Sequence, residues 1–334
     1  MMRKGMVRFA AVLAALCAAA VFTACEKKEG TAGKNYILKM STQLNETSIM
    51  VQGFKAWAKA VEERTGGGLK IQVMASATMG SDEDVIEQAL LGVNVAVLTD
   101  GGRMANYVKE FGIIGMPYIA DNYEELRKIT ETTAFAGWDA DMARRGIRIL
   151  SYNWYDGPRN FYANKPVRVP ADLNGQRIRT PGAPVWARSV AAMGATPIAM
   201  PWPESYNALQ SKAIDGVEVQ STSAYPARIY EVLTYLSKTE HFQLANFIMV
   251  GEKWYTSLPE DYQRILMEEC KKASYENALQ ILAAAGDYEK QMAGKGMRIV
   301  EADKAAFKQA AEAAYEELGF RELRDTIWKE IGKL

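Results

Sequence analysis

Residues 172–181 read DLNGQRIRTP, and residues 193–216 read MGATPIAMPWPESYNALQSKAIDG. The first stretch contains a predicted strand over 176–180. The second begins with a helix stop at Gly194, continues through a predicted strand over 196–200 and reaches a helix that starts at Pro203, a residue favoured in the first helical turn. An Asp-Gly turn then leads into a predicted strand over 217–220. Strands that alternate with helices in this way are typical of a mostly parallel sheet.

An alternation of the same kind fills the first part of the chain. Apolar residues recur at intervals of three and four from Val51 to Val61, which predicts one buried face of a helix. Three glycines at 66–68 end this helix. Ser81, followed by three acidic residues, predicts the capped start of the next helix. Further predicted strands lie over 36–40, 69–73, 95–98 and 147–150. The predicted fold class is therefore α/β.

A long helical stretch with few helix-breaking residues covers 259–292. The chain has 334 residues, enough for two lobes that each have their own core. We therefore predict two α/β lobes with the long helix spanning both. Lobe I is assigned residues 35–157 and about 245–285, and lobe II is assigned residues 158–244 and about 286–334.

The N-terminus predicts export. Residues 1–8 carry three basic side chains and no acidic one, and residues 9–22 form an uninterrupted apolar run. A run of this length is typical of a secretory signal and is short for a membrane span. Thr23, Ala24 and Cys25 follow it.

The end of this segment resembles a bacterial lipobox. In that motif the cysteine carries a diacylglyceryl group and becomes the first residue after cleavage, so the resemblance implies a lipidated Cys25. The motif prefers Leu where this chain has Phe22, and an ordinary signal peptide with an incidental cysteine is the alternative. Residues 1–24 are then the signal peptide and residues 25–34 a polar, flexible tether. We expect the mature protein in the periplasm or on the cell surface, attached to a membrane.

Charge and motif content exclude several kinds of function. Basic and acidic residues both number 40, so no overall field favours binding to nucleic acid. His241 is the one histidine, and the sequence has no nucleophile elbow, no phosphate loop and no paired-cysteine metal motif. We therefore expect no metal, no cofactor and no enzyme activity.

Residues 156–166 read DGPRNFYANKP and add a third segment to the two quoted first. Together the three closely resemble the solute-binding subunits of tripartite ATP-independent periplasmic (TRAP) transporters. The family pattern runs Gly-x-Arg, Asp-Leu-x-Gly-x-x-Ile-Arg-x-Pro, Met-Gly-Ala-x-Pro-x-x-Met, Glu-x-Tyr-x-Ala-Leu-Gln and Asp-Gly. The resemblance extends from about Leu38 to the Leu-Pro-Glu at Leu258, which is nearly the whole mature chain.

The resemblance implies a two-lobed periplasmic-binding-protein fold with the ligand in a cleft between the lobes. It also implies a carboxylate ligand held by Arg179, in the Ile-Arg-x-Pro segment. The planar fork of a guanidinium matches a carboxylate with two parallel hydrogen bonds. Arg159, in the Gly-x-Arg segment, is implied as a second carboxylate contact. Arg177 lies two residues from Arg179 and, with a side chain on the opposite face of the strand from the cleft, is expected to be solvated.

By the same alignment, Gln43, Asp100 and Trp202 line the cleft, with core packing or helix capping as the alternative role of each. Gln43 and Asp100 would hydrogen-bond the ligand, and Trp202 would offer a flat apolar wall. Sialic-acid-binding members have an asparagine that contacts the ligand carboxylate where this chain has Val219, so sialic acid is not expected. Gln220 then becomes a substitute contact.

The function that the resemblance implies is the capture of a small organic acid and its delivery to the membrane permease subunits of a TRAP transporter. A sensory ligand-binding lipoprotein of the same fold is one alternative. An exported lyase or hydrolase that uses Asp100 or Glu218 as its acid or base is another.

Overall fold

The computed structural model describes residues 35–334, so the predicted signal peptide, the tether and Cys25 lie outside the described residues. The strands are β1 (Tyr36–Ser41), β2 (Leu69–Met74), β3 (Val95–Asp100), β4 (Ile147–Ala163), β5 (Arg177–Thr180), β6 (Thr196–Ala199), β7 (Gly216–Gln220), β8 (Tyr235–Gly251) and β9 (Arg298–Glu301). The α-helices are α2 (Ile49–Arg64), α3 (Asp82–Leu90), α4 (Gly101–Met104), α5 (Tyr123–Thr130), α6 (Thr133–Arg144), α7 (Pro184–Ala192), α8 (Ser205–Gln210), α9 (Ser221–Ala224), α10 (Glu252–Tyr255), α11 (Glu260–Gly294), α12 (Lys304–Leu318) and α13 (Arg321–Glu330). The 3-10 helices are η1 (Lys109–Gly115), η2 (Pro170–Leu173), η3 (Trp202–Glu204) and η4 (Ile229–Glu231).

The first strands and helices follow the predicted pattern. Strand β1 pairs in parallel with β2 on one side and with β3 on the other. Helix α2 starts at its cap residue Ser48 and buries Phe54, Trp57 and Val61 on the predicted face. Ser81 and Asp84 form a reciprocal capping box at the start of α3, so the predicted cap is confirmed.

Two long antiparallel strands, β4 and β8, form the centre of the sheet and have 17 residues each. The prediction of a strand over 147–150 found only the start of β4. Gly157 and Pro158 inside the strand are ordinary strand breakers, which explains the error. The pairing with β8 absorbs them through register shifts near Ser151 and Gly157.

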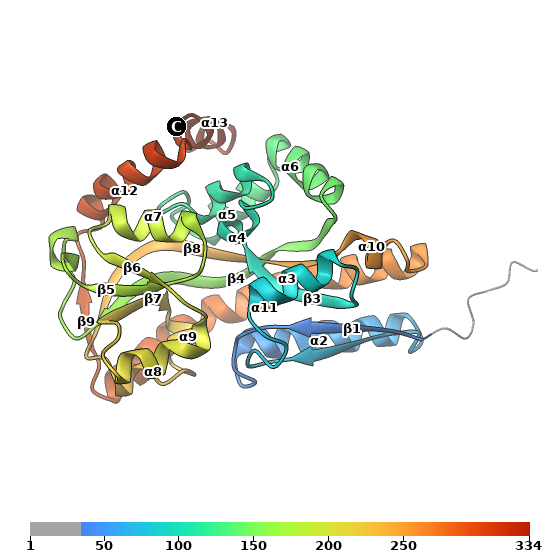
Figure 1. The fold of residues 1–334 in the computed structure, drawn as a ribbon, viewed down its shortest axis with the longest axis horizontal. Coiled ribbons are helices and arrows are strands. Elements are labelled where there is room, and N and C mark those ends of the chain that lie inside the picture. The colour runs from blue at the N-terminus through green and yellow to red at the C-terminus, as the bar shows by residue number, and fades with distance from the viewer. Residues whose placement is uncertain (1–34) are drawn as a thin grey trace, which may run out of the picture. The chain divides into compact units, whose positions relative to one another are not determined.

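Short strands extend the sheet on both sides of this central pair. The order is β2-β1-β3-β8-β4-β7-β5-β6, and β9 adds to β8. We call the part that holds β1–β3 lobe I and the part that holds β5–β7 lobe II. Figure 1 shows the two groups at opposite ends, with β4 and β8 running between them.

The long helix α11 packs against both lobes, as predicted. Its first half buries Leu266 in the apolar cluster around Trp57, and its middle buries Ile281 in the cluster around Phe111. Its last turns bury Met292 in a cluster of lobe II. One helix therefore contributes to the cores on both sides of the boundary.

The C-terminal helices connect lobe II back to lobe I. Helix α12 lies against α7 and buries Phe307 in a cluster of lobe II. The Tyr315 hydroxyl then donates to the carbonyl of Pro117 at 2.9 Å, and the Trp328 indole donates to the carbonyl of Ile119 at 2.8 Å. One residue of α12 and one of α13 thus hold the segment between η1 and α5.

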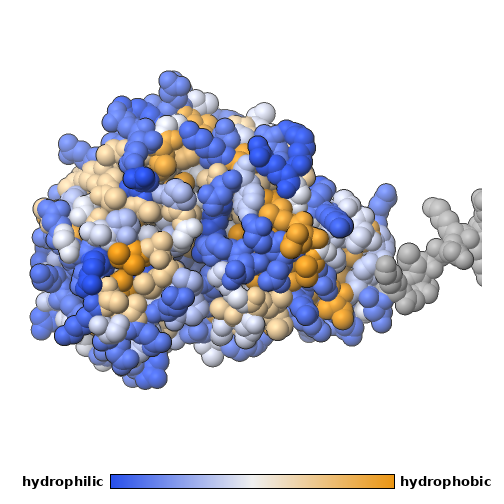
Figure 2. Space-filling view, viewed as in Figure 1, coloured by the Kyte–Doolittle hydropathy of each residue, from blue (hydrophilic) through white to orange (hydrophobic). Residues whose placement is uncertain are grey.

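The surface is mostly polar. Figure 2 shows a largely hydrophilic face on which apolar side chains gather in small areas, for example over α3. Within residues 35–334, no helix combines the length and the apolar character that a membrane span needs.

Gly251 sets the distance between β8 and α3 and provides a test of this packing. A Cβ atom at Gly251 would lie 1.9 Å from the carbonyl oxygen of Ala89 in α3. Backbone on both sides leaves little room to adjust, so we expect Gly251→Ala to lower the free energy of unfolding by about 1–3 kcal/mol. Urea unfolding followed by circular dichroism measures this change.

Gly286 in α11 is the matched control. It is exposed, and a Cβ there meets no atom within 4 Å. Gly286→Ala should raise the free energy of unfolding by about 0.5–1 kcal/mol, because alanine has the higher helix propensity. Equal effects of the two substitutions would contradict the proposed close contact of β8 and α3.

Candidate functional site

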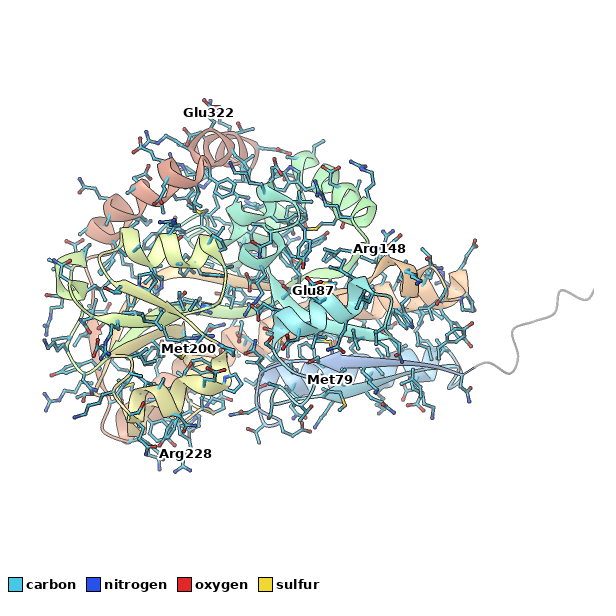
Figure 3. The ribbon with its side chains drawn as sticks, viewed as in Figure 1. Met79, Glu87, Arg148, Met200, Arg228 and Glu322 are labelled. Carbon is cyan, nitrogen blue, oxygen red and sulfur yellow. The ribbon has the colours of Figure 1, made fainter. Side chains whose placement is uncertain are left out.

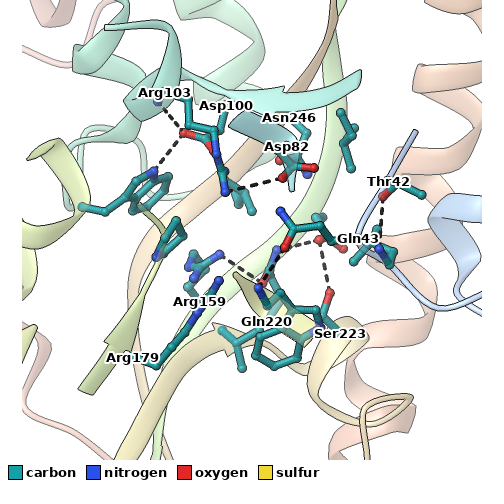
Figure 4. A pocket seen from close by; sticks show the side chains of 18 residues that line it. Thr42, Gln43, Asp82, Asp100, Arg103, Arg159, Arg179, Gln220, Ser223 and Asn246 are labelled. Carbon is teal, nitrogen blue, oxygen red and sulfur yellow. Dashed lines mark hydrogen bonds and ion pairs between the residues drawn. The ribbon is translucent and has the colours of Figure 1, made fainter. Parts of the chain in front are cut away.

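A cavity of about 80 Å³ lies between the lobes. All six residues predicted from the sequence line it: Gln43, Asp100, Arg159, Arg179, Trp202 and Gln220. The other lining residues are Thr42, Leu44, Asp82, Leu98, Arg103, Asp156, Pro181, Trp186, Val219, Ser223, Leu244 and Asn246. Figure 4 shows side chains from both lobes converging on this space.

Arg179 is a buried cation without a protein anion. Its Nε and Nη2 donate to the carbonyl of Met200 at 3.0 and 2.8 Å, and its guanidinium carbon lies 5.3 Å from the ring centre of Trp202. Among residues 35–334 it has no ion pair, and its Nη1 makes no hydrogen bond. Burial, with a smaller contribution from the Arg159 charge, lowers the pKa of Arg179 to about 9. An anion placed next to Arg179 would stabilise its charged form and raise the pKa again.

The loop after β6 holds Arg179 in place. Because β5 and β6 are parallel neighbours, the residue that follows β6 lies next to the end of β5. Met200 is this residue, and Figure 3 shows it in lobe II beside the boundary between the lobes. Its carbonyl fixes one edge of the guanidinium while the ring of Trp202 covers a face.

Arg177 points away from the cavity, as predicted. Its side chain is 43% exposed and pairs with Asp215 at 2.9 Å. The alternation of side chains along β5 therefore separates a solvated arginine from a buried one.

Arg159 lines the cavity, but its charge is already paired. Its Nε and Nη2 contact the two carboxylate oxygens of Glu218 at 2.5 and 2.6 Å, and its guanidinium lies over the ring of Trp186. Although burial alone would raise the pKa of Glu218, the Arg159 charge lowers it to about 2. Only Nη1 is left, and it donates to Gln220 at 3.3 Å. The sequence did not show this internal partner.

Asp100 is also occupied within the protein. It caps α4, where Oδ1 accepts from the backbone N–H of Arg103 at 3.0 Å, and its other oxygen pairs with the Arg103 guanidinium. The indole of Trp186, which belongs to lobe II, donates to Oδ1 at 2.9 Å. The helix-capping alternative for Asp100 therefore describes the local structure.

Further hydrogen bonds join the lobes next to the cavity. Oε1 of Gln43 accepts from the backbone N–H of Trp202 at 2.9 Å. The side chain of Asn45 donates to the carbonyl of Pro226 at 3.0 Å. With the bond between Trp186 and Asp100, these contacts hold the two lobes against each other over the cavity.

The sequence did not identify two buried acids in the cavity, Asp82 and Asp156. Asp82 is the first residue of α3, where the sequence pattern indicates only an acidic first turn. Asp156 lies inside β4, where its carboxylate accepts from Gln220, Thr222 and Ser223 at 2.6, 3.0 and 3.4 Å. Burial raises the pKa of Asp82 to about 6 and that of Asp156 to about 7. The sequence did not indicate that β4 continues through the boundary between the lobes, and Asp156 was therefore not recognised as a cavity residue.

The residues that the structure describes offer no metal centre. Within 35–334, no group of three or more histidine, cysteine, aspartate or glutamate side chains is arranged to hold a metal ion.

Comparison with known proteins gives a consistent family assignment. The family model described as "Bacterial extracellular solute-binding protein, family 7" matches residues 40–322. The sialic acid-binding periplasmic protein of Vibrio cholerae is 25% identical over 280 residues, which cover 84% of this chain and 87% of that protein.

Solved structures of TRAP periplasmic solute-binding proteins have the same fold. The protein from Ochrobacterium anthropi with bound L-fuconate is 29% identical, has a TM-score of 0.86 and covers 89% of this chain and 99% of its own. The apo, open structure from Escherichia fergusonii is 35% identical but has a TM-score of only 0.77, with 87% and 98% covered. The relative with the higher identity thus has the less similar shape. Together with the bonds between the lobes, this indicates a closed arrangement here.

The two buried acids predict a pH-dependent stability. A carboxyl group titrates near pH 4 in an unfolded chain, but Asp82 and Asp156 have folded-state pKa values of about 6 and 7. Their ionisation therefore destabilises the folded protein, and this penalty is fully present above pH 7. This penalty is relieved as the pH falls from 8 to 5. Buried His241 acts in the opposite direction, because burial lowers its pKa.

A double variant, Asp82→Asn with Asp156→Asn, isolates the contribution of the acids. We expect the ligand-free parent, relative to this variant, to gain about 1–3 kcal/mol of unfolding free energy between pH 8 and pH 5. Urea unfolding of both proteins at the two pH values measures the difference. Parallel pH profiles would show that the two carboxyl groups are not destabilised by burial.

Proposed function

The chain belongs to the bacterial extracellular solute-binding proteins of family 7, and we propose that it holds its solute, a small organic acid, through Arg179. The proteins of known structure that it resembles are the periplasmic solute-binding components of TRAP transporters. The chain is therefore a binding protein that works with a membrane permease, and it is not an enzyme.

The observation that carries the proposal is the unpaired charge of Arg179. A buried charge without a partner is costly, and folded proteins retain one where a ligand or metal completes the pair. One relative is a sialic acid-binding protein and another has bound L-fuconate, and each of these compounds carries a carboxylate. A carboxylate beside Nη1 of Arg179 would supply the missing anion and leave the bonds to Met200 intact.

The remaining predicted residues support this contact in different ways. Trp202 covers the guanidinium of Arg179 and Gln43 holds Trp202, so both act on the position of the cation. Nη1 of Arg159 donates to Oε1 of Gln220, so each of these side chains already uses part of its hydrogen-bonding capacity on the other. We therefore assign the main anion contact to Arg179 and a neighbouring polar role to Arg159 and Gln220.

Glu218 does not suit the role of a catalytic base that the enzyme alternative gave it. It is fully buried, paired with Arg159 and hydrogen-bonded by Thr180 at 2.9 Å. With a pKa of about 2 it binds protons weakly. Glu218 holds the guanidinium of Arg159 in position at the cavity wall.

Substitution of Arg179 tests the proposed contact. Arg179→Lys keeps a charge but loses the planar fork, so binding should weaken by about 1.5–3 kcal/mol. Arg179→Ala should weaken binding further, because the ligand charge would have no partner. Calorimetric titration measures both, with the acid that gives the largest thermal shift to the parent in a screen that includes L-fuconate and sialic acid.

Arg177→Ala is the control on the same strand. Since Arg177 is solvated and pairs with Asp215, its loss should change the affinity by less than about 0.5 kcal/mol. Parent-like binding by folded Arg179→Lys, or a large loss in Arg177→Ala, would contradict the assignment.

We also propose that a lipid on Cys25 anchors the protein to a membrane. The support is the lipobox-like sequence Phe-Thr-Ala-Cys at residues 22–25 and the polar segment that follows it. Lipoprotein acylation attaches more than one chain, which gives stable attachment where a single chain would not.

Labelling of cells with a fatty acid tests the anchor. The parent protein should take up the label and partition into detergent, and Cys25→Ser should lose both properties. Cys270→Ser, which removes a buried thiol of α11, is the control and should keep the label. Parent protein that stays unlabelled in the soluble fraction would refute the anchor and leave the binding function untouched.

A further inference from the structure

We propose that the cleft accepts only one anionic group, and that the solute is a monocarboxylate whose other end donates hydrogen bonds to Asp82. A dicarboxylate is then the wrong kind of solute. The inference rests on the proposed function, because it takes Arg179 as the site of the carboxylate.

The three arginines that line the cavity differ in their carboxylate partners. Arg103 has three carboxylate neighbours: Asp100, Glu83 at 2.7 Å and Asp82 at 3.4 Å. Arg159 is held by both oxygens of Glu218. Only Arg179 has no carboxylate partner among residues 35–334. The cavity therefore has one positive charge to offer to a ligand.

Asp82 and Asp100 lie across the cavity from Arg179. Figure 4 shows Arg159 and Arg179 on one side of the cavity and Asp100 with Arg103 on the other, where Asp82 also lies. Arg179, which has no carboxylate partner among residues 35–334, thus lies on the lobe II side of the cavity, and Asp82 lies on the lobe I side. A ligand that reaches from Arg179 across the cavity would meet carboxylates at its far end.

Among the acids of the cavity, Asp82 has room for a ligand. Asp100 already accepts three hydrogen bonds from Arg103 and Trp186, and Asp156 accepts three from polar side chains. Asp82 is approached only by Arg103 at 3.4 Å and by the side chain of Gln43. A carboxylate has about four acceptor positions, so Asp82 keeps unused ones. Its raised pKa agrees with a carboxylate that the protein compensates incompletely.

Ligand chemistry follows from this arrangement. Hydroxyl and ammonium groups both donate hydrogen bonds and would satisfy Asp82. A second carboxylate would lie beside the Asp82 charge without a cation of its own, and like charges at close range are strongly unfavourable. The shared requirement is therefore one carboxylate and at least one distal O–H or N–H donor.

Matched acids that differ only at the far end test the inference on the unmodified protein. One series is 4-hydroxybutanoate, 4-aminobutanoate and succinate, and the other is galactonate and galactarate. At pH 8, where Asp82 is ionised, we expect the monocarboxylate in a series that binds to have an affinity at least about tenfold higher than the dicarboxylate. Comparison of 4-hydroxybutanoate with 4-aminobutanoate distinguishes a hydroxyl donor from an ammonium donor.

The outcomes separate this inference from the proposed function. A dicarboxylate that binds as tightly as its matched monocarboxylate would overturn the single-anion inference and leave Arg179 as an anion site. If neither series nor a wider screen of organic acids shows any binding, the proposed function fails and this inference fails with it.

Asp82→Asn tests the residue that carries the discrimination. Asparagine keeps the size and one acceptor oxygen but removes the charge, so the preference for the monocarboxylate should fall by about tenfold. Asp287→Asn is the matched control, because Asp287 is 68% exposed on α11 and pairs with Lys290. An unchanged preference in folded Asp82→Asn would overturn the role of Asp82. Should that variant not fold, the comparison of matched acids on the parent protein decides the proposal.

Discussion

The antiparallel pairing of β4 with β8 is the constraint on which the rest of the structure depends. Both strands run from one lobe into the other, and every other strand in the sheet reaches this pair directly or through neighbours. The register of the pair therefore decides where the two lobes meet. Gly157 and Pro158 lie at the irregular part of the pairing, close to the residues that line the cavity. A bulged strand at this point lets the sheet change direction between the lobes.

Charge pairing then decides what the cavity can do. The protein places several ionisable groups in a small buried space, and nearly all of them have partners inside the chain. Arg159 with Glu218 and Arg103 with Asp100 form pairs whose charges cancel locally. Such pairs shape the walls and hold them rigid, which reduces the ordering cost when a ligand binds. Arg179 differs because its partners are a carbonyl and an aromatic ring, which orient a cation without neutralising it.

Several site residues serve the closed arrangement of the lobes as well as the cavity. Trp186 reaches from lobe II to Asp100, and Gln43 reaches from lobe I to the backbone of Trp202. A ligand that sits between these residues would be enclosed by bonds that exist only when the lobes are together. Contacts of this kind couple binding to closure, since they stabilise one arrangement over the other.

The sequence by itself determined the alternation of strands and helices around β1–β3 and β5–β7 and the face of β5 that carries Arg179, but not the long strand β8. These features depend on local periodicity and on neighbours a few residues apart. Only the tertiary structure decided that Glu218 neutralises Arg159, that Asp100 is occupied by Arg103 and Trp186, and that Asp82 faces the cavity. Arg159 and Glu218 are 59 residues apart and meet because β4 and β7 pair in one register. Local sequence carries no record of that register. Which arginine of the cavity has no carboxylate partner within residues 35–334 therefore appears only when the sheet is assembled.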